Sequence, residues 1–356
     1  MNRVKILFIA VLMLPALVYG EMKGVDGVIT MTTRTSIVRV GLNGSGTATI
    51  DWGDGSKKET VKIASVVYNE HHYSGTRPRT ITITGGNITD LYCQDDQLTA
   101  LDVSRNTSLA KLICNDNQLT VLDISRNTAL TELNCSSNRL TTLDVSQNMA
   151  LIILWCSKNQ LTALDASQNT ALTRLRCSGN RLTELNVSHS AALKYLDCSY
   201  TQLAELDVSR NTALTELWCD HTLLTTLDVS QNTALECLEC SYTRLTELDV
   251  SRNTALTKLW CDYTRLSALD VSNNTVLESL WCTNNQFTAD ALNNLFDTLH
   301  DNVITYEGKK GIKGIFILDN PGSADCDSSI VTAKGWKLVE KGIRAKKISN
   351  YGEKNQ

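Results

Sequence analysis

Residues 109–129 read LAKLICNDNQLTVLDISRNTA, and residues 130–150 read LTELNCSSNRLTTLDVSQNMA. The two segments align without a gap, and the same pattern recurs every 21 residues through the middle of the chain. Its clearest marker is a cysteine, found at Cys93, Cys114, Cys135, Cys156, Cys177, Cys198, Cys219, Cys240, Cys261 and Cys282. A fixed period of this length indicates a solenoid, in which each repeat forms one rung and stacks on the next.

The spacing within a repeat predicts a short strand. Leu112 and Cys114 are two residues apart, so both point to one side of a strand, while Lys111 and Ile113 point to the other. Stacked rungs then form a parallel sheet with the leucines and cysteines buried in columns. About ten residues remain for the return path, too few for a usual helix and two turns, so we expect the LDVS segment to be extended or 3₁₀. This is the leucine-rich-repeat pattern, with cysteine in place of a strand leucine.

The cysteines invite a disulfide interpretation, which the geometry disfavours. Neighbouring parallel strands hold their Cβ atoms about 4.8 Å apart and parallel, whereas a disulfide needs about 3.8 Å and converging bonds. We therefore expect small buried side chains with inert thiols. Cys237 and Cys240 resemble a CxxC redox motif, but residues three apart on a strand face opposite ways. We expect Cys237 to be exposed and Cys240 to be buried.

The repeats over residues 89–284 resemble those of the internalin family, the internalin J type above all, and related surface proteins of gut bacteria. The resemblance is carried by the 21-residue period and by the cysteine in each strand. It implies an extracellular, non-enzymatic role in adhesion or recognition. Internalins also carry a helical cap before the repeats and often a cell-wall anchor after them, and neither is recognisable in this sequence.

The first 20 residues have the features of a secretory signal peptide. Arg3 and Lys5 precede an apolar run from Ile6 to Leu17, and Gly20 marks a small-residue cleavage point. We expect a mature protein that begins near Glu21 and is secreted, exposed on the outer cell surface or periplasmic. The net charge of −4 and the absence of a basic stripe make nucleic acid an unsuitable partner.

Residues 21–88 predict a small antiparallel β-domain, because β-branched residues alternate with polar ones between glycine-rich turns. The segments WGDG at 52–55 and HHY at 71–73 are similar to hallmarks of polycystic-kidney-disease (PKD)-type β-sandwiches. We expect this domain to cap the open end of the solenoid core. A metal site formed by Asp51, Asp54, His71 and His72 is one interpretation of its polar residues, but we favour turn aspartates that bond their own backbone.

After the repeats, residues 285–342 predict a C-terminal α/β cap. Leu292, Leu295, Phe296 and Leu299 recur at helical spacing between Ala289 and His300, and residues 314–318 form an apolar run suited to a last strand. Residues 343–356 are a polar, partly basic tail. The expected architecture is thus a leucine-rich-repeat solenoid with little helix between a small N-terminal β-sandwich-like cap and this C-terminal cap.

Exposed strand positions should form columns with one residue per rung. We call the ten cysteines of the 21-residue register the cysteine ladder. Four of the six tryptophans, together with Glu239, fall directly before a ladder cysteine, and a second aromatic column lies two residues after the ladder. The candidate ligand-binding residues are Trp155, Trp218, Glu239, Trp260, Trp281, Tyr200, His221, Tyr242 and Tyr263. These aromatics predict either a binding surface on the concave face of the sheet or stacking that only stabilises it. Trp155 and Trp218 have no tryptophan on an adjacent rung, so stacking with one does not explain them.

Two polar columns have simpler explanations. An aspartate in nearly every LDVS segment could bridge rungs through calcium, but we favour carboxylates that bond local backbone N–H groups. The inner asparagines, such as Asn117 and Asn138, should satisfy the turning backbone.

Catalytic motifs such as GxSxG, HExxH and the P-loop are absent from the sequence, so we expect no enzyme activity, no cofactor and no metal site. The favoured function is a protein-binding module for adhesion or recognition, with a host or cell-surface partner. The alternative is a glycan-binding module on the same aromatic face, in which Asp220, Glu239 and Asp262 bond sugar hydroxyls.

Overall fold

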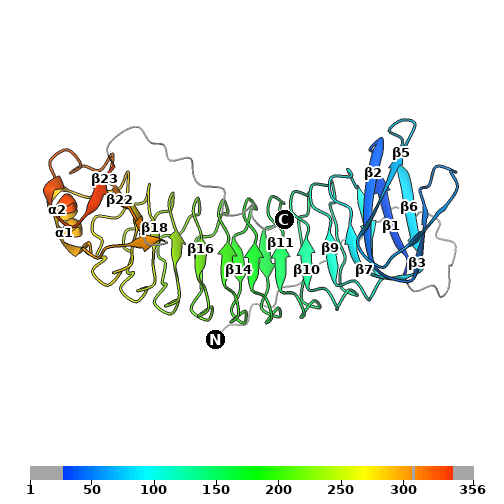
Figure 1. Ribbon diagram of the computed structural model, residues 1–356, viewed down its shortest axis with the longest axis horizontal. Helices are drawn as coiled ribbons and strands as arrows, with labels where there is room; N and C mark the ends of the chain where they lie inside the picture. The colour runs from blue at the N-terminus through cyan, green and yellow to red at the C-terminus, as the bar shows by residue number, and fades with distance from the viewer. Residues whose placement is uncertain (1–26, 307–308, 340–356) are drawn as a thin grey trace.

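The computed structural model describes residues 27–306 and 309–339 (Figure 1). The predicted signal peptide and the polar tail lie outside the described residues. Within them, the chain is a parallel β-solenoid with a β-domain at its N-terminal end and a small α/β unit at its C-terminal end. The predicted fold class is therefore confirmed.

The N-terminal β-domain is antiparallel. Its strands are β1 (Ile29–Thr33), β2 (Ile37–Ser45), β3 (Thr47–Asp51), β4 (Glu59–Lys62), β5 (Val67–His72), β6 (Arg79–Thr84) and β7 (Asn87–Tyr92). One sheet has the order β4-β3-β6-β1-β8, where β8 (Ala100–Asp102) comes from the first return segment of the solenoid. The alternation along β6 buries Ile81 and Ile83 and leaves the threonines beside them at least partly accessible.

Strand β7 joins this domain to the solenoid. It pairs antiparallel with β2 and parallel with β9, where Leu91 is in register with Leu112. A single 14-stranded sheet therefore runs from β5 through the repeats to the C-terminal unit. The repeat strands are β9 (Lys111–Ile113), β10 (Glu132–Asn134), β11 (Ile153–Trp155), β13 (Arg174–Arg176), β15 (Tyr195–Asp197), β16 (Glu216–Trp218), β17 (Cys237–Glu239), β18 (Lys258–Trp260) and β19 (Ser279–Trp281).

The return segments are mostly irregular. Two of them, β12 (Ala163–Asp165) and β14 (Glu184–Asn186), pair as a short parallel sheet, so the expected extended structure is present there. Among the described residues, no return segment forms the 3₁₀ helix that was the other expectation.

The C-terminal unit contains the predicted helix and strand. Helix α1 (Ala289–Thr298) begins at Thr288, whose side chain accepts a hydrogen bond from the Ala291 N–H, and it buries Leu292, Leu295 and Phe296. Strand β22 (Lys313–Phe316) continues the large sheet beside β19. The remaining elements are β20 (Thr305–Tyr306), β21 (Lys309–Lys310), α2 (Ser328–Ala333) and β23 (Trp336–Leu338).

The ten cysteines of the ladder are fully buried free thiols. Several donate hydrogen bonds to a carbonyl of the next rung, such as Cys219 Sγ to the Glu239 oxygen at 3.4 Å. The expectation for Cys237 was wrong, because this side chain is also buried. It lies in register between Glu216 and Lys258, whose longer side chains flank it on the face opposite Cys240.

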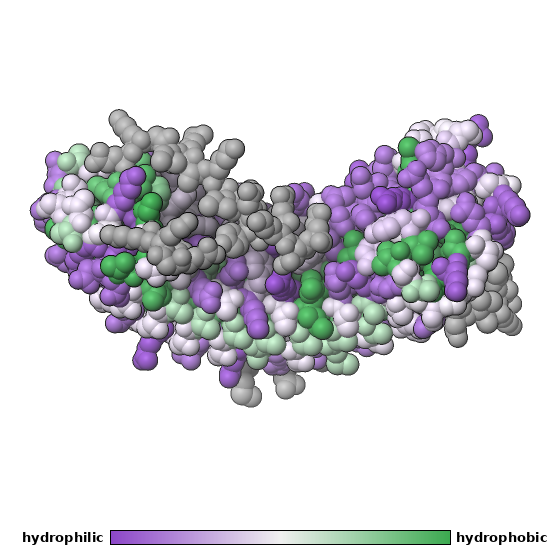
Figure 2. Space-filling view, in the orientation of Figure 1, coloured by the Kyte–Doolittle hydropathy of each residue, from purple (hydrophilic) through white to green (hydrophobic). Residues whose placement is uncertain are grey.

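Figure 2 shows that strongly hydrophobic residues form small, separate patches on the visible surface, among many hydrophilic ones. Large apolar patches on monomeric proteins usually mark interaction sites. Any binding site on this side must therefore be recognised from particular side chains rather than from a broad apolar area.

Candidate functional site

Three of the predicted tryptophans form one group on the exposed face of the 14-stranded sheet, which we call the sheet face. The ring centroids of Trp218 and Trp260 are 5.7 Å apart, and those of Trp260 and Trp281 are also 5.7 Å apart. Phe316 extends the group, with its ring centroid 4.6 Å from that of Trp281. We call these four residues the aromatic cluster. Phe316 was missed because β22 follows Cys282 by more than one repeat length, outside the 21-residue register.

The tryptophans of the cluster are half-buried rather than fully exposed. Stacking with another tryptophan does account for Trp218, contrary to the expectation from the sequence, because its ring reaches Trp260 across an intervening rung.

Glu239 lies on that intervening rung and is only 2% exposed, so its expected position at the surface was wrong. The indoles of Trp218 and Trp260 meet across its rung. One of its carboxylate oxygens accepts a hydrogen bond from the Ser241 N–H at 3.2 Å.

Trp155 stands apart from the aromatic cluster. Its ring lies beside the guanidinium of Arg176, whose carbon is 5.3 Å from the indole centroid, and the same guanidinium is 5.1 Å from the centroid of Tyr195. Burial raises the pKa of Tyr195 to about 12, although Arg176 acts in the opposite direction. Trp155 therefore belongs to a cationic environment and not to the tryptophan group.

The second predicted column is a continuous pile of rings, which we call the ring stack: Tyr200, His221, Tyr242 and Tyr263. Successive ring centroids are 4.2, 4.1 and 4.4 Å apart, with interplanar angles of 16°, 9° and 8°. Tyr200 is 54% exposed, and Tyr242 and Tyr263 are each 41% exposed. Because the faces of the inner rings cover one another, the stack offers mainly ring edges, hydroxyl groups and the imidazole edge to a partner.

The ring stack coincides with a change in the backbone bonding of the solenoid. In earlier rungs an asparagine links the rungs: Asn138 donates to the carbonyls of Cys114 and Cys135 and accepts from the Leu119 N–H. In the rungs of the stack a threonine takes this place, and the Thr243 hydroxyl donates to the Cys240 carbonyl of its own rung. Ring stacking therefore supplies contact between rungs where the side-chain amide is missing.

The aspartates of the LDVS segments bond to nearby backbone of their own segment, which is the interpretation that we favoured. The carboxylate in each of these positions accepts the N–H of the serine two residues later, for Asp102, Asp123, Asp144, Asp165, Asp207, Asp228, Asp249 and Asp270. The amide oxygen of Asn186 does the same. Hydrogen bonds from Ser209 hold the pKa of Asp207 below its usual range.

The polar residues of the β-domain do not converge on a metal. Asp51 and Asp54 accept the N–H groups of Gly53 and Ser56, as expected for turn aspartates. The His71 ring stacks on Trp52 with centroids 4.8 Å apart and bonds Asp54 at 2.8 Å. Across residues 27–306 and 309–339, no group of three or more His, Cys, Asp or Glu side chains could hold a metal ion.

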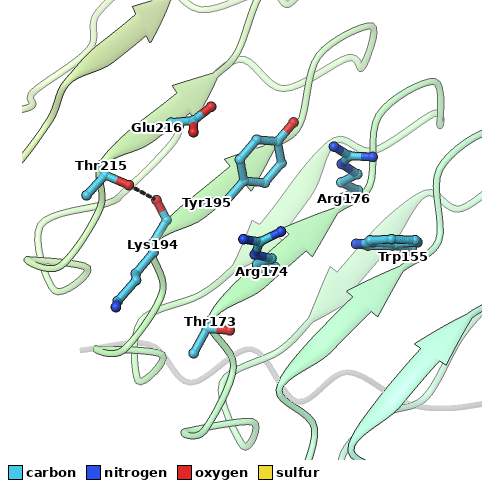
Figure 3. A pocket seen from close by; sticks show the side chains of 8 residues that line it. All are labelled: Trp155, Thr173, Arg174, Arg176, Lys194, Tyr195, Thr215 and Glu216. Atoms are coloured by element: carbon cyan, nitrogen blue, oxygen red, sulfur yellow. Dashed lines mark hydrogen bonds between the residues drawn. The ribbon is translucent and has the colours of Figure 1, made fainter. Parts of the chain in front are cut away.

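A pocket of about 400 Å³ opens on the sheet face at the N-terminal side of the aromatic cluster (Figure 3). We call it the basic pocket, and it is lined by Trp155, Thr173, Arg174, Arg176, Lys194, Tyr195, Thr215 and Glu216. Sequence reasoning singled out only Trp155 among them. Strand position could have indicated others, because Arg174, Tyr195 and Glu216 each lie two residues before the column that contains the tryptophans and so share its face of the sheet.

No protein-family model matches the chain, and the curated proteins contain no match. Among solved structures, the functional domain of InlJ from Listeria monocytogenes, which includes a cysteine ladder, is 36% identical with a TM-score of 0.60. That alignment covers 71% of this chain and 53% of the InlJ chain, so this chain spans about half of that structure.

Two more distant structures are similar in fold alone. YopM, a leucine-rich effector protein from Yersinia pestis, is 20% identical with a TM-score of 0.52, and the alignment covers 65% of this chain and 61% of YopM. The octameric complex of latrophilin 3, Unc5D and the leucine-rich-repeat protein FLRT2 contains a chain that is 18% identical with a TM-score of 0.54, and the alignment covers 70% of this chain and 89% of that one.

The described part of the chain has no helix with the length and apolar character of a membrane span. Its register of buried leucines and cysteines, its parallel repeat strands and these structural matches agree with one another. The chain is therefore a leucine-rich-repeat protein of the parallel β-solenoid type, similar to the InlJ domain.

Proposed function

We propose that this chain is a protein-binding module for adhesion or recognition, and that its partner contacts the sheet face. The observation that carries this proposal is the concentration of aromatic side chains on neighbouring rungs. The two groups share the rungs of Cys219 and Cys261, where a tryptophan precedes the cysteine and a ring of the stack follows it, so they overlap along the sheet. Exposed tyrosines and tryptophans are enriched among the residues that dominate protein interfaces.

The two aromatic groups have complementary properties. Half-buried indoles provide a fixed apolar surface, because their neighbours restrict their rotation. The tyrosines of the ring stack are more exposed and present their edges. A rigid apolar centre beside adaptable polar groups is typical of a protein interface.

The similar structures support this function. The InlJ structure is that of a functional domain with a cysteine ladder, and FLRT2 is present in a complex with other proteins. We further infer a secreted or surface-exposed bacterial protein of the internalin J type, with a PKD-like N-terminal β-domain, from the sequence features described above. The absence of recognisable catalytic motifs supports a role without enzyme activity.

A glycan-binding module is the second candidate. Asp220, Glu239 and Asp262 lie on the same rungs as the aromatics, and the sequence suggested that their carboxylates bond sugar hydroxyls. In the structure these residues are buried, with exposed fractions of 2%, 2% and 9%. Sugar rings, however, stack on open aromatic faces, and the indole of Trp260 has aromatic neighbours on both sides. The arrangement therefore favours a protein partner.

The test is capture of partners from the native environment with three purified proteins: wild type, W218A/W260A and Y68A. Tyr68 is 43% exposed on the β-domain and provides an aromatic control remote from the cluster. We expect one or more proteins to bind wild type and Y68A but not W218A/W260A, with unchanged circular dichroism. Binding that survives the double substitution would contradict the proposal. Hits on a glycan array without any protein partner would favour the second candidate.

A further inference from the structure

The basic pocket carries three cationic side chains and one acidic one. Arg174, Arg176 and Lys194 line it together with Glu216, over strands β13, β15 and β16 (Figure 3). Its volume of about 400 Å³ is within the range of ligand-binding pockets. It therefore has room for one or two side chains of a partner.

Arg176 is held in place without a carboxylate. The rings of Trp155 and Tyr195 lie within 5.3 and 5.1 Å of its guanidinium carbon. The carboxylate in register on the next strand is that of Asp197, which accepts hydrogen bonds from the hydroxyls of Ser178 at 2.9 Å and Ser199 at 2.6 Å. Aromatic contacts fix the guanidinium while its N–H groups retain capacity for an anion.

Arg174 and Lys194 add exposed positive charge to the same pocket. Among the residues that the structure describes, neither forms a salt bridge, and neither does Arg176. Arginine presents a planar set of donors that matches a carboxylate with two parallel hydrogen bonds. The pocket is thus suited to a carboxylate ligand.

We propose that the basic pocket binds an acidic segment of the protein partner, with Arg174 and Arg176 as the carboxylate-binding residues. This inference rests on the proposed function and names the chemistry of the partner. An acidic peptide fits better than an acidic glycan, because the Arg176 guanidinium already lies against both aromatic rings and leaves fewer faces for a sugar. Three cations are few for a nucleic acid, whose binding requires many phosphate contacts.

The test measures the affinity of a fluorescent hexaglutamate peptide for the full chain by anisotropy, with hexaglutamine and an oligogalacturonate as comparison probes. We expect hexaglutamate to bind and hexaglutamine not to bind. R174Q should weaken hexaglutamate binding about fivefold and R174Q/R176Q more than about tenfold. Because Arg174 is exposed, R174Q provides a readout that does not disturb the packing around Arg176.

The matched control is R210Q/R252Q, which removes the same charge from exposed arginines in the DVSRN return segments. We expect it to change hexaglutamate affinity less than about twofold. Equal losses in the two double variants would overturn the pocket as the site, as would a lack of hexaglutamate binding to wild type. Oligogalacturonate binding markedly tighter than that of hexaglutamate would overturn a peptide as the occupant.

The two proposals fail separately. W218A/W260A replaces none of the residues that line the basic pocket, and the one contact it removes there is the long hydrogen bond, 3.4 Å, from Trp218 Nε1 to the Glu216 carboxylate. Because all three cations remain, the variant should retain hexaglutamate binding while losing the captured partner. If the partner is captured through the tryptophans but hexaglutamate does not bind, only the pocket proposal fails. If hexaglutamate binds and the partner is insensitive to the tryptophans, only the aromatic interface fails.

Discussion

The indole rings of Trp218 and Trp260 meet edge to face at an interplanar angle of 85°, although a complete rung separates their strands. The contact bridges the rung of Glu239 and so couples three consecutive repeats. Rungs of a solenoid are otherwise stabilised mainly by their immediate neighbours. The pair therefore adds a stabilising contact of longer range along the axis.

Replacing Trp218 by alanine should lower the free energy of unfolding by about 1 to 3 kcal/mol, because it removes half-buried apolar area and the edge-to-face contact. Urea denaturation followed by circular dichroism measures this loss. Trp155 stands apart from the other tryptophans and lies beside Arg176, so W155A is the comparison and should lose less. Equal losses in both variants would contradict a special role for the Trp218–Trp260 contact.

The ring stack should compensate for the missing asparagines. Tyr242 contacts rings on both sides, at centroid distances of 4.1 and 4.4 Å, so Y242A should destabilise the protein by about 1 to 2 kcal/mol. The double variant Y242A/T243N should recover part of this loss, because an asparagine at position 243 could donate to the Cys219 carbonyl and accept from the Leu224 N–H, as Asn138 does in its own rung. Urea denaturation of the two variants and of T243N alone gives the comparison. No recovery would show that stacking does not replace the amide bonds.

The features that could be predicted from the sequence are those fixed by backbone geometry. The 21-residue period and the two-residue alternation decide that Leu112 and Cys114 are buried, and the strand spacing keeps neighbouring thiols from pairing. The hydrogen bonds of Asp123 and Asn117 could likewise be predicted, because the first is made within one turn and the second recurs from rung to rung. Such properties follow from one repeat and apply to all similar repeats.

The features that could not be predicted depend on the direction in which the longer side chains lean along the sheet. The burial of Glu239 and Cys237 follows from the rotamers of neighbours on adjacent rungs, which the pattern of one repeat does not contain. The basic pocket similarly needs Arg176 to lie between two rings from different strands. The repeat pattern assigns its residues to three columns but does not indicate that Trp155 would contact a cation rather than a ligand.

The thiols should differ sharply in reactivity. Burial raises the pKa of Cys114 and of the other ladder cysteines, and their side chains are inaccessible. Burial also raises the pKa of Cys326, but this side chain is only half-buried, so a reagent can reach it. Alkylation at pH 8 should therefore modify about one thiol per native chain, and all 12 in denaturant. Mass spectrometry of digested protein should locate the native modification at Cys326, and C326S should abolish it. Rapid modification of a ladder cysteine would contradict the packing.

The junction between the β-domain and the first repeat should be sensitive to pH through Asp96. Its carboxylate accepts the Arg39 N–H at 2.8 Å, its backbone carbonyl accepts from the Thr33 hydroxyl, and its N–H donates to Asn117. The side chain is buried, and this burial raises the pKa of Asp96 from 3.8 to about 7. The folded chain therefore holds a proton that the unfolded chain has already released between these two pH values.

Because the folded state binds this proton more tightly, Asp96 contributes fully to stability below about pH 4. The contribution decreases as the pH rises and is lost once the pH exceeds about 7. The loss amounts to about 4 kcal/mol at most. D96N carries a neutral side chain of the same shape, so it should be more stable than wild type at pH 8 and similar at pH 4. Urea denaturation between these pH values tests this, with D301N at an exposed site as the control. A wild-type stability that rises over this range in parallel with D96N would show that Asp96 is ionised in the folded protein.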